Sequence, residues 1–132
     1  MNLSRVLYPC TLLMLVAAGS AQGQPQRCHV EPFQGATLPQ GAVAHMRVVN
    51  TGDLCALVNY GLPSEHANPA DSGSITKQPT HGKAEFVAPN AKYAPDVGYV
   101  GEDEFEFEAF ARGRVNQQVR LKVQVKVIVT AP

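Results

Sequence analysis

The chain has 132 residues, of which 11 are basic and 11 acidic, so its formal net charge is zero. Its length fits one domain of ordinary size, and an apolar content of 45% with balanced charge excludes a disordered tail. Balanced charge also argues against nucleic-acid binding, which depends on a basic stripe or a high isoelectric point. No apolar run approaches the roughly 20 residues that span a bilayer, so we expect no stable membrane span.

Residues 1–21 are predicted to be a secretory signal peptide. A single charge, Arg5, precedes an apolar run over 6–19, and Gly19 and Ala21 are small residues at the spacing of a cleavage site. The alternative for the same run is an N-terminal core strand or helix. Cleavage after Ala21 predicts an exported protein, periplasmic or extracellular, with a polar linker over 22–27 and one domain over 28–132.

Cleavage also removes Cys10 and leaves two cysteines, Cys28 and Cys55. Two cysteines in an oxidising compartment usually pair. Their wide separation is unlike the short ligand spacings of zinc sites. We therefore predict a Cys28–Cys55 disulfide, which stabilises the fold by about 3.5 kcal/mol in the chain-entropy model.

Apolar residues in the rest of the chain recur with a period of two, which predicts an all-β protein. The first expected strands are a valine-rich segment over 42–49 and an apolar run over 54–60, joined by a turn over 50–53. The prolines, glycines and polar residues of 61–73 predict a loop. Two brief strands over 74–77 and 83–87 then flank a turn over 78–82.

The last third of the chain predicts a β-hairpin. Aromatic and acidic residues alternate over 104–108, and apolar and polar residues alternate over 119–127, as in strands with one buried face. A tight turn centred on Gly113 pairs apolar with apolar and acidic with basic residues. The predicted pairs are Phe105–Leu121, Phe107–Val119, Glu104–Lys122 and Glu106–Arg120.

Five acidic residues lie between Glu102 and Glu108. Such a cluster is compatible with a metal or cation site. The hairpin offers another interpretation, because at least two of these carboxylates face basic residues on a solvated strand surface. We interpret the cluster as that solvated face, in which each exposed ion pair contributes only about 0.2–1 kcal/mol.

A spaced motif runs from Ile75 to the C-terminal valine-rich strand. It has the form Q-P-x-H-G, then Y-x-P, then G-Y-x-G-x-D-x-F-x-F, and covers about half of residues 22–132. Its members are Gln78, Pro79, His81, Gly82, Tyr93, Pro95, Gly98, Tyr99, Gly101, Asp103, Phe105 and Phe107. This pattern resembles the bacterial Ig-like and cadherin-like domains of cell-surface proteins. The resemblance implies a single Ig-like, antiparallel β-sandwich of about seven strands.

The resemblance implies structural rather than catalytic roles for the motif. Its glycines suit turns that need positive φ or close backbone approach, and Asp103 suits hydrogen bonds from turn amides. Its aromatic rings suit the space between two sheets. The sequence departs from the family pattern because it shows no internal repeat, and it lacks cadherin-type calcium motifs.

Enzymatic and metal-binding signals are weak. The sequence has no G-x-S-x-G elbow around Ser74, and its histidines follow no metal-ligand spacing. We therefore expect a non-catalytic, cofactor-free module that binds an unknown protein or envelope component through an outer strand or the loop over 61–73. The alternative is a periplasmic protein that binds copper, zinc or calcium on a β-sandwich, with ligands among His45, Met46, His66 and His81.

Overall fold

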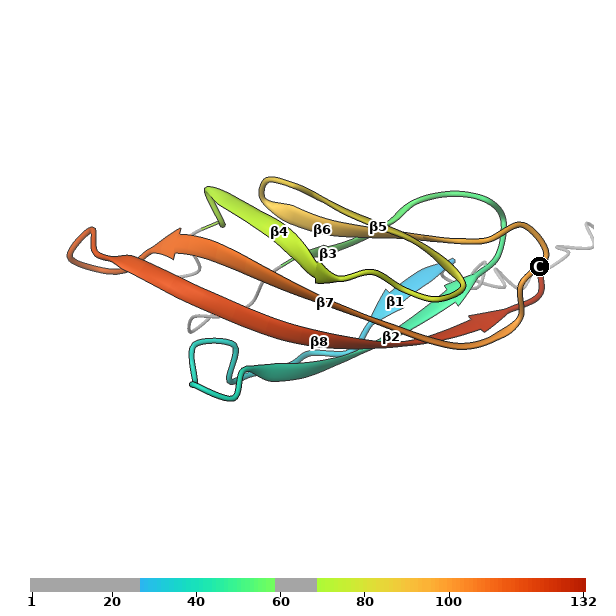
Figure 1. The fold of residues 1–132 in the computed structure, drawn as a ribbon, viewed down its shortest axis with the longest axis horizontal. Helices are drawn as coiled ribbons and strands as arrows, with labels where there is room; N and C mark the ends of the chain where they lie inside the picture. The colour runs from blue at the N-terminus through green and yellow to red at the C-terminus, as the bar shows by residue number, and fades with distance from the viewer. Residues whose placement is uncertain (1–26, 59–68) are drawn as a thin grey trace, which may run out of the picture.

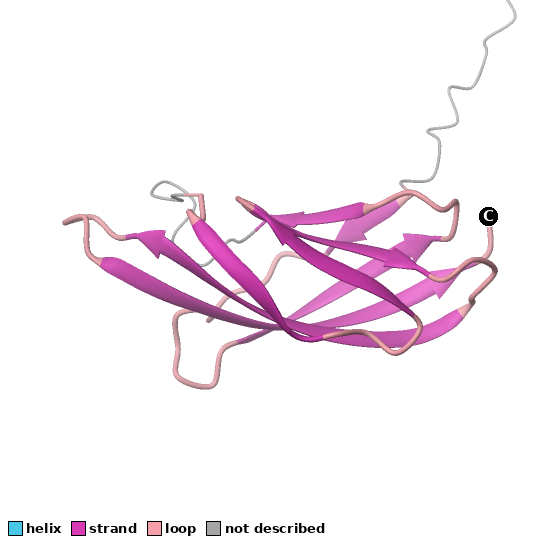
Figure 2. Cartoon of the chain, turned by 45° about the horizontal axis from the view of Figure 1, so that its top comes forward, coloured by secondary structure: helices cyan, strands magenta, loops and turns pink. Residues whose placement is uncertain are grey.

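The computed structural model describes residues 27–58 and 69–132, which form eight β-strands in two facing sheets (Figure 1). The described residues contain strands, turns and loops but no helix (Figure 2). The prediction of an all-β protein is therefore confirmed. The expected signal peptide, residues 22–26 of the linker and most of the expected loop over 61–73 lie outside the described residues.

The five-stranded sheet has the order β1-β2-β8-β7-β4, and the three-stranded sheet has the order β3-β6-β5. The strands are β1 (Cys28–Val30), β2 (Ala42–Val49), β3 (Cys55–Val58), β4 (Ser72–Lys77), β5 (Gly82–Val87), β6 (Asn90–Pro95), β7 (Gly101–Arg112) and β8 (Gln118–Thr130).

The expectation of a wholly antiparallel sandwich is wrong for one strand pair. β2 runs parallel to β8, with Ala42 opposite Val123 and Val49 opposite Thr130. The other strand pairs of the described sheets are antiparallel. Parallel neighbours require a long connection, which β3 to β7 supply here. The larger sheet is therefore mixed, and the described residues contain eight strands rather than about seven.

Two other expectations are corrected. Neither β1 nor β6 was expected, because β1 has three residues and β6 buries only Ala91, Tyr93 and Pro95. β4 begins at Ser72, inside the expected loop, and Asp71 N–H already bonds to the Phe110 carbonyl of β7. The expected strand over 42–49 is confirmed as β2, which alternates between buried and exposed residues.

The predicted hairpin is confirmed, but its register is wrong. Arg112 pairs with Gln118, so the connection is the longer loop 113–117. Gly113 N–H donates to Gln117 O, and Asn116 adopts a φ of 61°. The observed pairs are Phe105–Val125, Phe107–Val123, Glu104–Lys126, Glu106–Gln124 and Glu108–Lys122. Each partner is displaced by four residues along β8. Because that number is even, the aromatic face is still the buried one.

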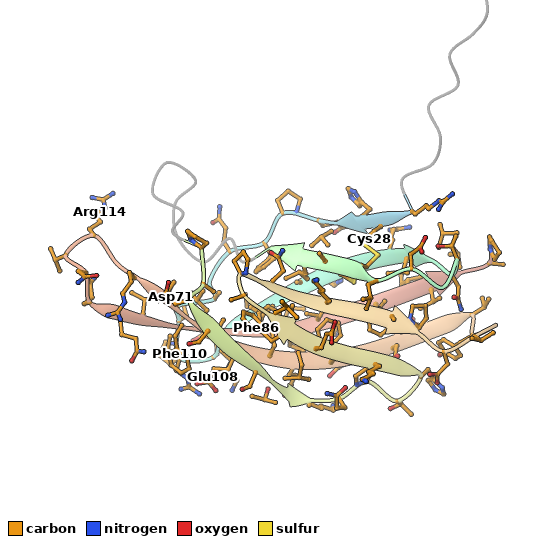
Figure 3. The ribbon with its side chains drawn as sticks, turned by 90° about the horizontal axis from the view of Figure 1, so that it is seen from above. Cys28, Asp71, Phe86, Glu108, Phe110 and Arg114 are labelled. Carbon is orange, nitrogen blue, oxygen red and sulfur yellow. A yellow bond between two sulfur atoms is a disulfide. The ribbon has the colours of Figure 1, made fainter. Side chains whose placement is uncertain are left out.

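The core between the sheets is built from aromatic rings and valines. Tyr93, Phe105 and Phe107 are fully buried, and the Tyr93 and Phe105 rings stack with centroids 5.6 Å apart. The predicted Cys28–Cys55 disulfide is confirmed, and it connects β1 of one sheet to β3 of the other, with the Cα atoms 5.7 Å apart (Figure 3). The two layers are therefore joined by packing at the centre and by a covalent bond at one edge.

Candidate functional site

The polar groups of the sequence motif meet inside the fold at Asp103, on β7. Its Oδ1 accepts hydrogen bonds from the amides of Thr80 and Glu104, at 3.0 and 2.9 Å. Its Oδ2 accepts from the His81 amide at 3.1 Å and from the Tyr93 hydroxyl at 2.8 Å. Four donors satisfy this 8% exposed carboxylate, so its local role is to hold the turn between β4 and β5 against β7.

The motif's rings and glycines are also engaged in internal contacts. Burial, together with the hydrogen bond to Asp103, raises the pKa of the Tyr93 hydroxyl, which keeps that group neutral. The His81 ring stacks on Tyr99 with centroids 4.2 Å apart. A Cβ on Gly82 would lie 2.5 Å from the Ala94 carbonyl oxygen, so only glycine fits this close approach without a shift.

Gln78, the first motif residue, pairs with the edge of the three-stranded sheet. Its side-chain amide donates to the Ala84 carbonyl at 3.0 Å, and its side-chain oxygen accepts from the Ala84 amide at 3.1 Å. The carboxamide thus bonds to one residue of β5 as a neighbouring strand would. This contact of Gln78 was not predicted, because the linear pattern does not show which sheet edge its side chain contacts.

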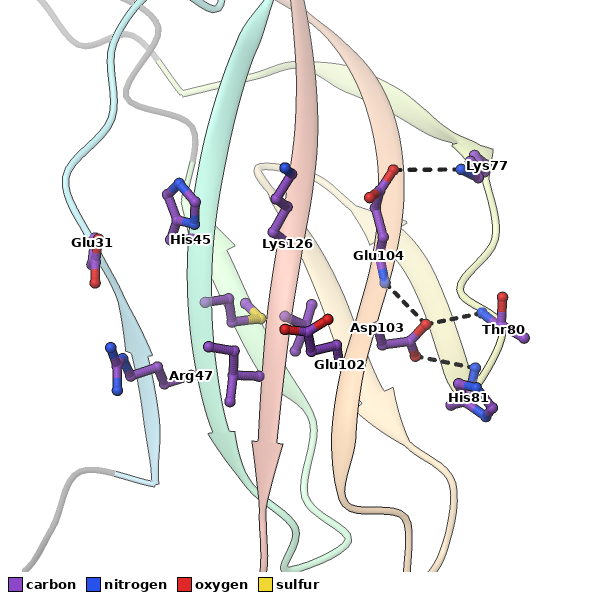
Figure 4. Close-up of a pocket in the computed structure, with 13 residues that line it drawn as sticks. Glu31, His45, Arg47, Lys77, Thr80, His81, Glu102, Asp103, Glu104 and Lys126 are labelled. Atoms are coloured by element: carbon purple, nitrogen blue, oxygen red, sulfur yellow. Dashed lines mark hydrogen bonds and ion pairs between the residues drawn. The ribbon is translucent and has the colours of Figure 1, made fainter.

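The outer face of the five-stranded sheet is the strongest candidate for a functional surface. Alternation along β2, β7 and β8 directs polar and charged side chains to this face. A shallow hollow of about 650 Å³ crosses it (Figure 4). Its lining includes Glu31, His45, Arg47, Glu102, Glu104 and Lys126.

Two of the five acidic residues between Glu102 and Glu108 form ion pairs or hydrogen bonds on this face. Glu104 accepts from the Gln124 side chain at 2.6 Å and pairs with Lys77 at 3.4 Å. The Gln124 bond, helped by Lys77, lowers the pKa of the Glu104 carboxyl. Glu108 forms a bidentate ion pair with Arg120, and the hydrogen bonds from Arg120 lower the pKa of the Glu108 carboxyl. These contacts agree with the interpretation of a solvated sheet face, although the partners differ from the expected ones.

Other charges on the face have no such partner. Neither Arg47 nor Glu102 makes a side-chain hydrogen bond or ion pair with the residues that the structure describes. Between them on β8 lies Ile128, which is 43% exposed. This row was missed at the sequence level, because only the parallel pairing of β2 with β8 brings its members together.

The expected metal-ligand candidates are not brought together. His45 is exposed on the outer face, Met46 points into the core, and His81 is stacked on Tyr99; His66 lies outside the described residues. Over 27–58 and 69–132, no three His, Cys, Asp or Glu side chains form a group suited to a metal ion. Ser74, the serine considered for catalysis, lies on β4 opposite Glu108.

Compared with family models, curated proteins and solved structures, the chain matches none of them. Among the residues placed by the structure, no helix has the length and apolar character needed to cross a membrane.

Proposed function

We propose that the chain is an exported, non-catalytic Ig-like domain that acts through surface contacts, as a binding or structural module of the bacterial periplasm or envelope. The proposal depends on one observation: the polar and aromatic residues of the sequence motif are occupied by contacts within the domain. Asp103, Tyr93 and His81 are engaged in contacts inside the domain, so their chemistry serves the scaffold. What remains exposed and distinctive is the charged outer face with its hollow.

Two further points support the exported part of this proposal. The facing sheets are joined by a disulfide between strands of different layers, and such bonds persist in oxidising compartments. The expected signal peptide over 1–21 agrees with that compartment. Cell fractionation followed by N-terminal sequencing tests export. We expect a chain that begins at Gln22 outside the cytoplasm, whereas a cytoplasmic chain that keeps Met1 contradicts it.

The binding role is tested by site-specific photo-cross-linking in intact cells. A benzophenone amino acid at Val43 places the probe on the outer face of the five-stranded sheet, where Val43 is 45% exposed. The same probe at Val87, which is 49% exposed on β5 of the other sheet, is the matched control. We expect a cross-link to a different protein or envelope component from position 43 and not from position 87. Equal cross-linking from both positions, or none from either, contradicts the proposed use of this face.

A further inference from the structure

One row of side chains across the outer face has a self-complementary order of charge. Arg47 on β2 lies opposite Ile128 on β8, and Ile128 lies opposite Glu102 on β7. Across three adjacent strands the row therefore reads cation, apolar residue, anion. The backbone positions of the two charges are about 10 Å apart, which is twice the spacing of neighbouring strands. Figure 4 shows Arg47 and Glu102 on this one face of the sheet.

The two charges of this row have no partner within the described part of the chain, unlike two of the carboxylates beside them. Glu104 and Glu108 are paired with Lys77 and Arg120 on the same face. Arg47 and Glu102 are exposed, and within the described part of the chain neither side chain has an ion pair or hydrogen bond. An exposed isoleucine between two unpaired, opposite charges provides an apolar contact with a polar group on each side.

We propose that this face binds a second copy of the same chain, related by a half-turn about an axis that runs along β8 between the two sheets. This rotation places Ile128 against the second copy's Ile128 and exchanges the strands on either side. Arg47 then faces the second copy's Glu102, and Glu102 faces the second copy's Arg47. One row thus provides two ion pairs around an apolar contact. The inference goes beyond the proposed function, and it holds whether or not the domain has another partner.

The same rotation also brings like charges together. Arg120, Lys122 and Lys126 lie on the same exposed side of β8 as Ile128, so each faces its own counterpart in the second copy. Arg120 is paired with Glu108, whereas Lys122 and Lys126 have no ion pair within the described residues. The proposal therefore predicts weak association. It also predicts that removing the Lys126 charge strengthens association.

The test is sedimentation equilibrium of the purified, disulfide-bonded protein and of charge-reversed variants. Arg47→Glu places two glutamates against each other at each contact, and Glu102→Arg places two arginines there. We expect each variant alone to weaken self-association by about tenfold or more. An equimolar mixture of the two variants should associate again, because one copy then supplies only anions and the other only cations. The double variant R47E/E102R should associate as the original does.

Two further variants complete the design. Lys126→Gln is expected to strengthen association by a few-fold, whereas Lys83→Glu, on the exposed surface of β5, should leave it unchanged. Circular dichroism and thermal unfolding check that each variant folds, which we expect because all four positions are solvent-exposed. A monomeric parent protein, single variants that associate like the parent, or a mixture that fails to recover would each overturn the proposal. A photo-cross-link from Val43 to a different protein bears on the proposed function, whereas a cross-link between two copies of this chain supports the self-association proposed here.

Discussion

At the residue scale, Asp103 is the most constrained polar group of the described chain. Each of its two oxygens accepts two hydrogen bonds, and an asparagine would turn an NH₂ group toward two donors whichever way it is oriented. We expect Asp103→Asn to lower the free energy of unfolding by about 2–4 kcal/mol. Urea unfolding at neutral pH measures this change.

The matched control for that substitution is Tyr93→Phe. It removes one donor and leaves three amides on the carboxylate, so its expected cost is about 1–2 kcal/mol. If the asparagine variant proves no less stable than the phenylalanine variant, the carboxylate does not hold the turn as described.

Tyr93 also predicts a dependence of stability on alkaline pH. Its pKa is raised in the folded protein, so the folded state keeps its proton at a pH where the unfolded chain, with an ordinary pKa of 10.0, releases it. The contribution is fully present below pH 10 and is lost as the pH rises above it, by about 1.4 kcal/mol per pH unit. Thermal unfolding between pH 8 and about 11.5, compared with Tyr93→Phe, isolates this effect. Parallel curves for the two proteins would contradict it.

At the element scale, Gln78 predicts protection of one backbone amide. β5 is an edge strand, and the unpaired groups of an edge strand are open to water and to other chains. Gln78→Ala should therefore speed hydrogen exchange of the Ala84 amide by about tenfold or more and lower stability by about 1 kcal/mol. Glu85, whose amide alternates toward β6, is the internal control in the same NMR spectra. Equal acceleration at both amides would indicate general destabilisation instead.

The hairpin shows what an alternating pattern determines and what it leaves open. Strict alternation of Phe105 and Phe107 with glutamates predicts which face is buried, because side chains on a strand point to opposite sides in turn. Loop length is not contained in that pattern. The connection 113–117 depends on a positive φ at Asn116 and on the Gln117 side chain, whose oxygen accepts from the Val115 amide, and only Gly113 marked a turn in the sequence.

At the scale of the whole molecule, the candidate surface depends on pairing between distant segments. The valine pattern of β2 does not predict that this strand runs parallel to β8. A parallel and an antiparallel pairing would bury the same face of β2. The row of Arg47, Ile128 and Glu102 exists only because of that pairing. The buried motif around Asp103 was partly accessible from the sequence because a resemblance implied it, whereas the exposed row had no local signal.

The disulfide connects the two sheets through their shortest strands, β1 and β3, so its contribution to stability can be predicted. β1 has three residues and β3 has four, so neither strand has many backbone hydrogen bonds. Their link closes a loop of 27 positions, and its loss should lower the free energy of unfolding by about 3.5 kcal/mol and Tm by about 10–20 °C. The aromatic and valine core between the sheets stays in place when the bond is reduced, so the protein should still fold at 25 °C.

Thermal unfolding of the parent protein, with and without a reducing agent, measures this contribution. The double variant C28A/C55A is the control, because it should be insensitive to reductant and close in stability to the reduced parent without burying a hydroxyl at position 55. Mass spectrometry should show the parent gaining two hydrogens on reduction. If the reduced parent unfolds at the same temperature as the oxidised one, packing across the sheets already fixes β1 and β3, and the covalent link adds little to the sandwich.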